Sequence, residues 1–212
     1  NAMDGVAGLT QKAVAPGESF DYALTAPDAG TYWYHAHNRS WEQVARGLYG
    51  PLIVEEASPP DVDRDVIVMV DDWRLMESGD FAPGFVNRHD QAHQGRLGNF
   101  AKALIDDASP VRKGDRLRLR LINVATDRVF PLVLAGVAGK VVALDGMPLP
   151  RPEPLAEALV RGPGQRAELI GDVTAAPDET AHLVRLEDQE AASQVAFPVT
   201  GLASAARRDA PD

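Results

Sequence analysis

The sequence predicts an all-β protein built from β-sandwich domains, and three observations support this. No long amphipathic helix is evident in the 212 residues. The 16 prolines and 18 glycines fall between short apolar runs, as expected for strands joined by turns. Several of these runs alternate apolar and polar residues with the two-residue period of a strand. Many short strands of this kind are typical of sandwich folds.

Three strands are expected before the first linker, each an apolar run flanked by turn residues: 18–26, 31–37 and 47–55. In the first of them, Phe20, Tyr22 and Leu24 would share one face. The second is rich in aromatic and β-branched side chains, which favour strands. Just before the third, residues 44–46 can form a short helical turn.

Residues 57–63 contain two prolines and two aspartates without periodicity, and we interpret them as a linker. We therefore expect residues 1–57 to belong to one domain and residues 58–202 to a second. The small and charged residues at 203–212 should form a fraying tail.

Within the second domain, the clearest strand spans residues 115–124, where leucines and arginines alternate. Three leucines should point to one face of the sheet and three arginines to the other: Leu117, Leu119 and Leu121 against Arg116, Arg118 and Arg120. Since the chain is acidic overall, we expect the arginine face to be solvated or salt-bridged rather than a basic binding stripe.

The other strands predicted in this domain are shorter apolar runs: 64–72, 130–134, 140–144, 165–170, 182–186 and 195–199. Residues 74–100 are polar and rich in glycine and histidine, so we expect an irregular excursion there. We expect one helical turn within residues 151–158.

Composition argues against several classes of function. Lys and Arg number 21 and Asp and Glu 31, so the net charge of −10 disfavours nucleic-acid binding. The sequence contains no run of 18 apolar residues, which argues against a membrane helix. The absence of cysteine excludes disulfides and thiolate metal sites within this chain. The first eleven residues lack the basic and apolar regions of a signal peptide, and we expect the chain to begin inside a domain.

The residues that carry chemistry are His35 and His37. On a strand, residues two apart project from the same face, about 6.6 Å apart, and Trp33 shares that face. The alternate residues should point towards a core: Tyr32, Tyr34 and Ala36. Two neutral imidazoles so placed can bind one metal ion, or one ion each of a close pair, and imidazole suits copper, zinc, iron and nickel. The alternative is that both are ordinary strand residues with satisfied hydrogen bonds.

The segment GTYWYHAHNRSWEQVARGLYGPLIVEE, residues 30–56, resembles the second copper-ligand segment of multicopper oxidases, the family of laccases, bilirubin oxidases and copper-resistance oxidases. Residues 1–11, NAMDGVAGLTQ, resemble the stretch that follows the family's first ligand segment, His-Trp-His-Gly. Three later motifs resemble the middle domain of bacterial three-domain members: DDWRL at 71–75, GRLGN at 95–99 and LDG at 144–146.

This resemblance implies cupredoxin-like Greek-key β-sandwiches, the first truncated, in an oxidase that reduces O2 to water with electrons from a small donor. His35 and His37 would each bind a different copper of the dinuclear type 3 pair. Asp4 would help deliver protons to reduced oxygen, although on the residues alone it is a turn residue before Gly5.

The resemblance also implies what this chain lacks. The cysteine of the type 1 copper is absent, and the remaining ligand segments are expected before Asn1 and after Asp212. The chain would hold part of the trinuclear cluster, and its second domain would carry no copper of its own. A periplasmic or extracellular location is implied, and the donor stays open between phenols, cuprous ion and manganous ion.

Two other interpretations remain at this point. Gly30, His35, His37 and Glu42 nearly match the first metal motif of cupins, which bind one iron or manganese ion, although no histidine follows residues 162–164 as a second motif would require. The chain could instead be a non-catalytic cupredoxin module that serves structure or interaction.

Further polar residues are assigned no chemistry. His89 and His93 have the spacing of a helical zinc motif, but the surrounding glycines favour a solvated or interface loop. His182 is expected to be structural. Asp71 and Asp72 are adjacent on a strand, so their carboxylates should point in opposite directions.

Overall fold

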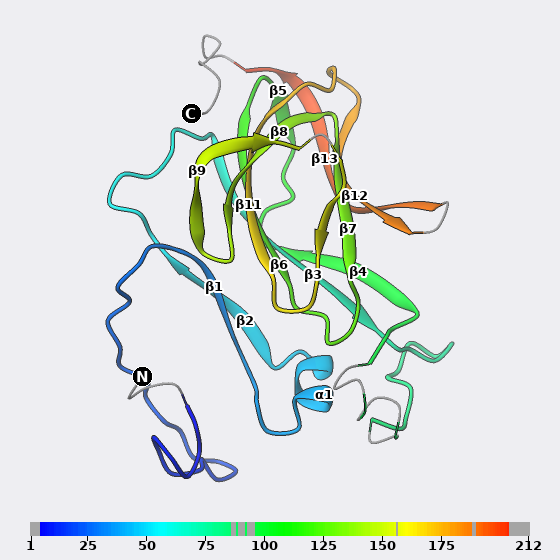
Figure 1. Ribbon diagram of the computed structural model, residues 1–212. Coiled ribbons are helices and arrows are strands. Elements are labelled where there is room, and N and C mark those ends of the chain that lie inside the picture. Colours follow the sequence, from blue (N-terminus) through cyan, green and yellow to red (C-terminus); the bar gives the residue numbers. More distant parts are fainter. Residues whose placement is uncertain are drawn as a thin grey trace.

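The computed structural model describes residues 5–85, 88, 92, 96–155, 157–187 and 190–203, which form three β-sheets. A two-stranded hairpin pairs β1 (Gly30–His35) with β2 (Tyr49–Val54). Its connection contains α1 (Ser40–Gln43) and the 3-10 helix η1 (Val44–Arg46). Figure 1 shows the hairpin lying beside a sandwich of the other two sheets, with α1 at its lower end.

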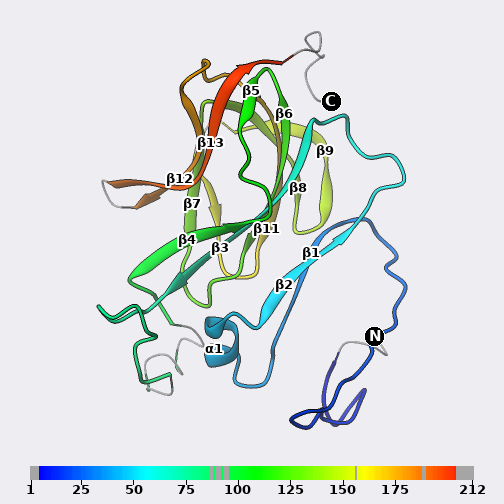
Figure 2. The ribbon, with the colours of Figure 1, turned by 180° about the vertical axis from the view of Figure 1, so that it is seen from behind.

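The larger sheet of the sandwich has six strands in the order β4 (Phe100–Ile105), β3 (Arg64–Trp73), β6 (Arg116–Asn123), β11 (Arg166–Val173), β8 (Val137–Leu144) and β9 (Met147–Pro154). Its strands are antiparallel except for the parallel pair β3 and β6. The view from behind in Figure 2 also shows β1 and β2 beside this sandwich.

The smaller sheet has five strands in the order β10 (Leu159–Arg161), β7 (Phe130–Ala135), β12 (Thr180–Glu187), β13 (Glu190–Leu202) and β5 (Val111–Lys113). Here the parallel pair is β13 and β5. None of the helices formed by the described residues has the length and apolar character that a membrane span requires.

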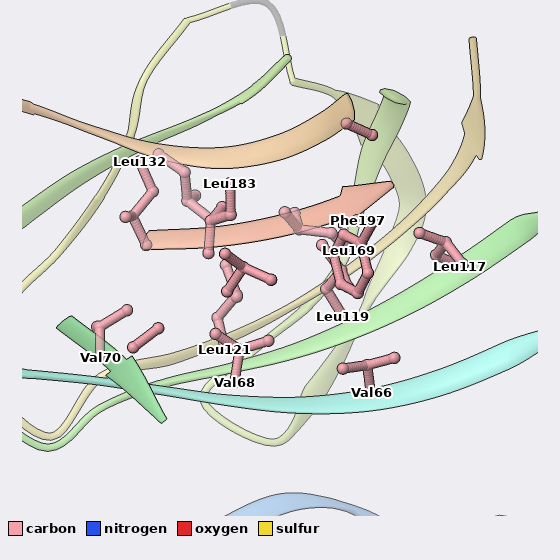
Figure 3. Packing of buried hydrophobic residues seen from close by; sticks show 14 of the residues in the cluster. Val66, Val68, Val70, Leu117, Leu119, Leu121, Leu132, Leu169, Leu183 and Phe197 are labelled. Carbon is pink, nitrogen blue, oxygen red and sulfur yellow. The ribbon is translucent and has the colours of Figure 1, made fainter. Parts of the chain in front are cut away.

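The hydrophobic core fills the space between the two sheets, as Figure 3 shows. Leu117, Leu119 and Leu121 of β6 point into it and are almost fully buried. The opposite sheet contributes Leu183 and Phe197. The alternation of β6 therefore has the predicted consequence, because one face of the strand supplies the core and the other is free to meet the hairpin.

Two predicted elements are wrong. Residues 18–26 form no strand, and Phe20, Tyr22 and Leu24 are exposed. Alternation makes a segment suitable for a strand, but a strand also needs a hydrogen-bonded neighbour, and the described residues provide none there. The helical turn expected within 151–158 is replaced over Arg151–Pro154 by the end of β9. Its prolines lack N–H donors and fit an edge strand, which β9 is.

The remaining expectations differ less from the structure. The turn at 44–46 is the 3-10 helix η1, and the predicted strands at 31–37 and 47–55 are β1 and β2 with shorter ends. The strands that sequence reasoning missed are β4, β5, β9 and β10. Two of them, β5 and β10, have only three residues each, too few for a pattern to be recognised.

Candidate functional site

The end of β1 presents a stack of three aromatic rings. The centroids of the Trp33 and His35 rings lie 4.2 Å apart, with planes inclined by 22°. Those of His35 and His37 lie 4.6 Å apart, inclined by 25°. The three rings therefore lie on one face of the strand, as the two-residue period predicts, and the two imidazoles are held side by side.

The hydrogen bond of His35 determines which of its nitrogens is available. Its Nδ1 lies 3.2 Å from the carbonyl oxygen of Ala36. Because a carbonyl oxygen only accepts, Nδ1 must donate, and in the neutral ring the lone pair is then on Nε2. Burial lowers the pKa of His35; the charge of His37 acts in the same direction, and the bond to Ala36 opposes both. At neutral pH the ring is thus a neutral imidazole, the form that binds metals.

A pocket of about 250 Å³ opens beside this stack. The hairpin side of the pocket is lined by Trp33, His35, Ser40 and Val44. Two loops of the sandwich close the other side, and they contribute Ala125, Thr126, Pro163 and Gly164. The pocket has room for an ion and water molecules against the His35 ring.

The donor set fits copper in kind but is incomplete. Imidazole nitrogen suits Cu²⁺, and His35 and His37 supply two such ligands on one face. In the part of the chain that the structure describes, no group of three or more His, Cys, Asp or Glu side chains is placed to hold a metal ion. A complete site would therefore need ligands beyond this pair.

Glu42, the carboxylate of the cupin interpretation, does not join the histidines. It lies on α1, where it forms ion pairs with Arg39 at 2.5 Å and with Arg46 at 3.1 Å. Because two guanidinium groups already pair with this carboxylate, it is not directed at a metal ion beside the histidines. The two-histidine, one-glutamate set of a cupin is thus not assembled here.

The other residues singled out in the sequence have separate positions. Asp4, His89 and His93 lie outside the described residues. His182 pairs with Ser193 through its Nδ1 at 2.8 Å from Oγ, which agrees with a structural role. The expectation that Tyr34 points to a core is wrong, because it is 62% exposed. Tyr32, two residues earlier, instead packs close to Gly146 of the sandwich, so only part of that face is covered.

Asp71 and Asp72 point apart and serve two different contacts. Asp71 accepts a hydrogen bond from the hydroxyl of Tyr49 at 2.5 Å, while Asp72 accepts one from Nε of Arg128 at 3.0 Å. Burial is the main cause that raises the pKa of Asp71, to about 7. The raised pKa of Asp71 thus reflects its burial in the contact between β2 and β3.

Sequence reasoning did not identify the residues that hold β1 against the sandwich. The arginine face of β6 is salt-bridged, which was one of the two expected alternatives, but it is also buried, and Glu168 of β11 lies opposite Arg120. Thr31 of β1 reaches this pair and is fully buried. The alternation of β6 could have indicated them, because it places three arginines on one face. If another element covers that face, the arginines need acidic partners.

Comparison with known proteins supports one family. The family model described as multicopper oxidase matches residues 1–59. Laccase-2 of Botryotinia fuckeliana is 32% identical over 197 residues, which cover 82% of this chain and 32% of that protein. Multicopper oxidase MmcO of Mycobacterium tuberculosis is 31% identical over 206 residues, covering 83% of this chain and 40% of MmcO.

Solved structures agree over nearly the whole chain. Lac15 from a marine microbial metagenome has 54% identity and a TM-score of 0.86, with 99% of this chain and 52% of Lac15 covered. The multicopper oxidase of Pseudomonas thermotolerans has 32% identity and the same TM-score, with 100% of this chain and 50% of that one covered. The chain thus spans about half the length of these solved relatives. Its sequence and its cupredoxin-like β-sandwich both agree with these relatives, and the chain belongs to the multicopper oxidase family.

Proposed function

We propose that this chain is part of a laccase-like multicopper oxidase, which couples one-electron oxidation of a donor to the four-electron reduction of O2 to water. The observation that carries the proposal is the stacked pair of His35, at the end of β1, and His37, two residues beyond it, with His35 lining an open pocket. Membership of the multicopper oxidase family supports the reaction type.

In this proposal His35 and His37 each hold one copper of the type 3 pair. Copper bound there would supply the one-electron redox chemistry that the reduction of O2 requires. The protein's part is to present two neutral imidazoles in fixed orientation. Trp33 does this by packing on the His35 ring, and the Ala36 carbonyl by fixing the protonated nitrogen.

Asp4 is proposed as the proton-relay residue. Reduction of O2 to water consumes protons, and a carboxylate near the cluster can pass them from solvent. The support for this role is the position of Asp4 in the Met-Asp-Gly segment, inside the region that the family model matches.

The rest of the copper centre is proposed to come from sequence other than these 212 residues. The chain has no cysteine for a type 1 copper and spans 50% to 52% of the two solved relatives. We assign residues 1–57 to the ligand-bearing first domain and residues 58–202 to a second domain without copper, followed by a tail at 203–212. Upstream and downstream cupredoxin segments are then the partners that complete the cluster.

The donor and the location follow the family. We propose a small donor, either a phenol or a reduced metal ion, and action in the periplasm or outside the cell. Among the relatives, one is named a laccase and another an iron transport multicopper oxidase. Those names describe the relatives, and the described residues contain no feature that selects one donor.

Equilibrium dialysis against Cu²⁺ tests the proposal on this chain. The chain should bind copper weakly, His35→Asn and His37→Asn should each lose about half of the bound metal and the double variant most of it, and His182→Asn should behave as the wild type. No oxidation of a phenolic dye is expected, since most ligands are absent. Robust dye oxidation would contradict the expectation that most ligands are absent from these residues, and a preference for one iron or manganese ion would contradict the multicopper assignment.

A further inference from the structure

The face of β1 that carries the histidines begins at a buried threonine. Thr31, Trp33, His35 and His37 are spaced two residues apart, so their side chains project on the same side of the strand. Thr31 is 0% exposed, whereas the histidines stand at the open end beside the pocket. Four residues of strand separate Thr31 from His35, a distance of about 13 Å.

The hydroxyl of Thr31 is engaged from two sides. It donates to Oε1 of Glu168 at 2.5 Å, and it accepts from Nη1 of Arg120 at 3.1 Å. Arg120 and Glu168 face each other across the β6–β11 pair and are each 3% exposed. Since both the donor and the acceptor capacity of the hydroxyl are used in a buried setting, the side chain has one favourable orientation.

A wider ion network keeps Arg120 and Glu168 in place. Arg120 forms a bidentate ion pair with Asp65, with both nitrogen–oxygen distances at 2.7 Å. The second oxygen of Glu168 accepts from Nε of Arg118 at 3.0 Å, and Arg118 also pairs with Glu56, just after β2. Both strands of the hairpin are therefore bound to one buried charge network on the sandwich.

The backbone of β1 is also fixed at this end. Nε of Arg166 donates to the carbonyl oxygen of Thr31 at 3.3 Å. Gly30 packs so closely on the β8–β9 turn that a Cβ there would lie 2.7 Å from the carbonyl oxygen of Gly146. The strand thus has no room to slide or rotate at Thr31 without breaking contacts.

We propose that Thr31, Arg120 and Glu168 are positioning residues for the histidine pair. The buried contact at Thr31 sets the register and rotation of β1, and the Trp33 ring carries that orientation to His35 and then to His37. Because a one-residue slip of a strand exchanges its faces, this anchor keeps the His35 imidazole at the pocket and the His37 imidazole stacked on it. The copper-binding part of the inference rests on the proposed function, whereas the positioning of the rings does not.

A metal-free measurement tests the positioning directly. The Hε1 proton of His35, assigned by its loss in His35→Asn, should show a ring-current shift from the stacked Trp33. Thr31→Val removes the hydroxyl at nearly constant shape and should abolish most of that shift, while Thr31→Ser should retain it. Thr200→Val is the matched control, because Thr200 is an exposed strand threonine bonded to the Val111 carbonyl, and its substitution should change nothing.

Titration with Cu²⁺, followed by quenching of Trp33 fluorescence in a Trp41→Phe, Trp73→Phe background, supplies the second readout. Thr31→Val and Glu168→Gln should bind Cu²⁺ about tenfold more weakly than the wild type, and Thr31→Ser should recover the affinity. An unchanged His35 shift in folded Thr31→Val, or wild-type affinity in both variants, overturns the positioning role. If the wild type binds no Cu²⁺, the proposed function fails and the His35 shift alone decides the positioning.

Discussion

The hydroxyl of Tyr49 donates a hydrogen bond to the carboxylate of Asp71 at 2.5 Å, which joins β2 of the hairpin to β3 of the sandwich. Both groups are largely buried, and burial raises the pKa of each, that of Asp71 to about 7. Together with the contacts of Thr31, this bond determines how the histidine-bearing hairpin sits on the sandwich.

Tyr49→Phe should lower the free energy of unfolding by about 1–3 kcal/mol, because it leaves Oδ2 of the buried Asp71 carboxyl without its donor. Urea denaturation measures this loss. Tyr34→Phe is the control, since Tyr34 is exposed. Equal effects of the two variants would contradict the importance of the Tyr49 contact.

Asp71 should make stability depend on pH. Its pKa is raised from 3.8 to about 7, so between these values the folded state binds more protons than the unfolded chain. The free energy of unfolding contributed by Asp71 is then highest below about pH 4 and falls as pH rises to about 7, by at most about 1.4 kcal/mol per pH unit.

Asp71→Asn keeps the shape but cannot titrate, so this slope should disappear between pH 5 and 7. Denaturation of wild type and variant across that range gives the difference. The exposed Asp21→Asn should keep the wild-type slope. A wild-type slope in Asp71→Asn would place the origin of the pH dependence elsewhere.

Phe85 should stabilise the excursion after β3 against the hairpin. Its ring lies between two guanidinium groups, with Arg46 of η1 at 4.1 Å and Arg96 at 3.9 Å from the centroid. Phe85→Leu should cost about 1–2 kcal/mol through loss of both cation–π contacts. Phe81→Leu, whose ring lies 5.8 Å from Arg46, should cost less in the same denaturation experiment.

Local patterns predicted the features that depend on strand period alone. The two faces of β6 and the shared face of His35 and His37 follow from alternation and are found in the structure. Residues 18–26 show the limit of that reasoning, since alternation does not supply a neighbouring strand.

The anchor of β1 could not be predicted because it joins distant residues. Thr31 and Glu168 are 137 positions apart, and the histidine segment that contains Thr31 gives no indication of its buried partner. Because β1 meets β11 only in the folded chain, both the burial of the arginine face of β6 and the role of Thr31 follow from the tertiary structure. The same non-locality concealed the Tyr49–Asp71 bond.

The most direct test of the copper-binding role of His35 and His37 is the electron paramagnetic resonance spectrum of one equivalent of Cu²⁺ bound to this chain. His89→Asn and His93→Asn are introduced first, to remove competing imidazoles. Because His35 and His37 would each hold a different ion, the spectrum should show superhyperfine coupling to one imidazole nitrogen per Cu²⁺, which persists in either single His→Asn variant and disappears when both histidines are replaced. An identical spectrum after replacement of both His35 and His37 would contradict the account.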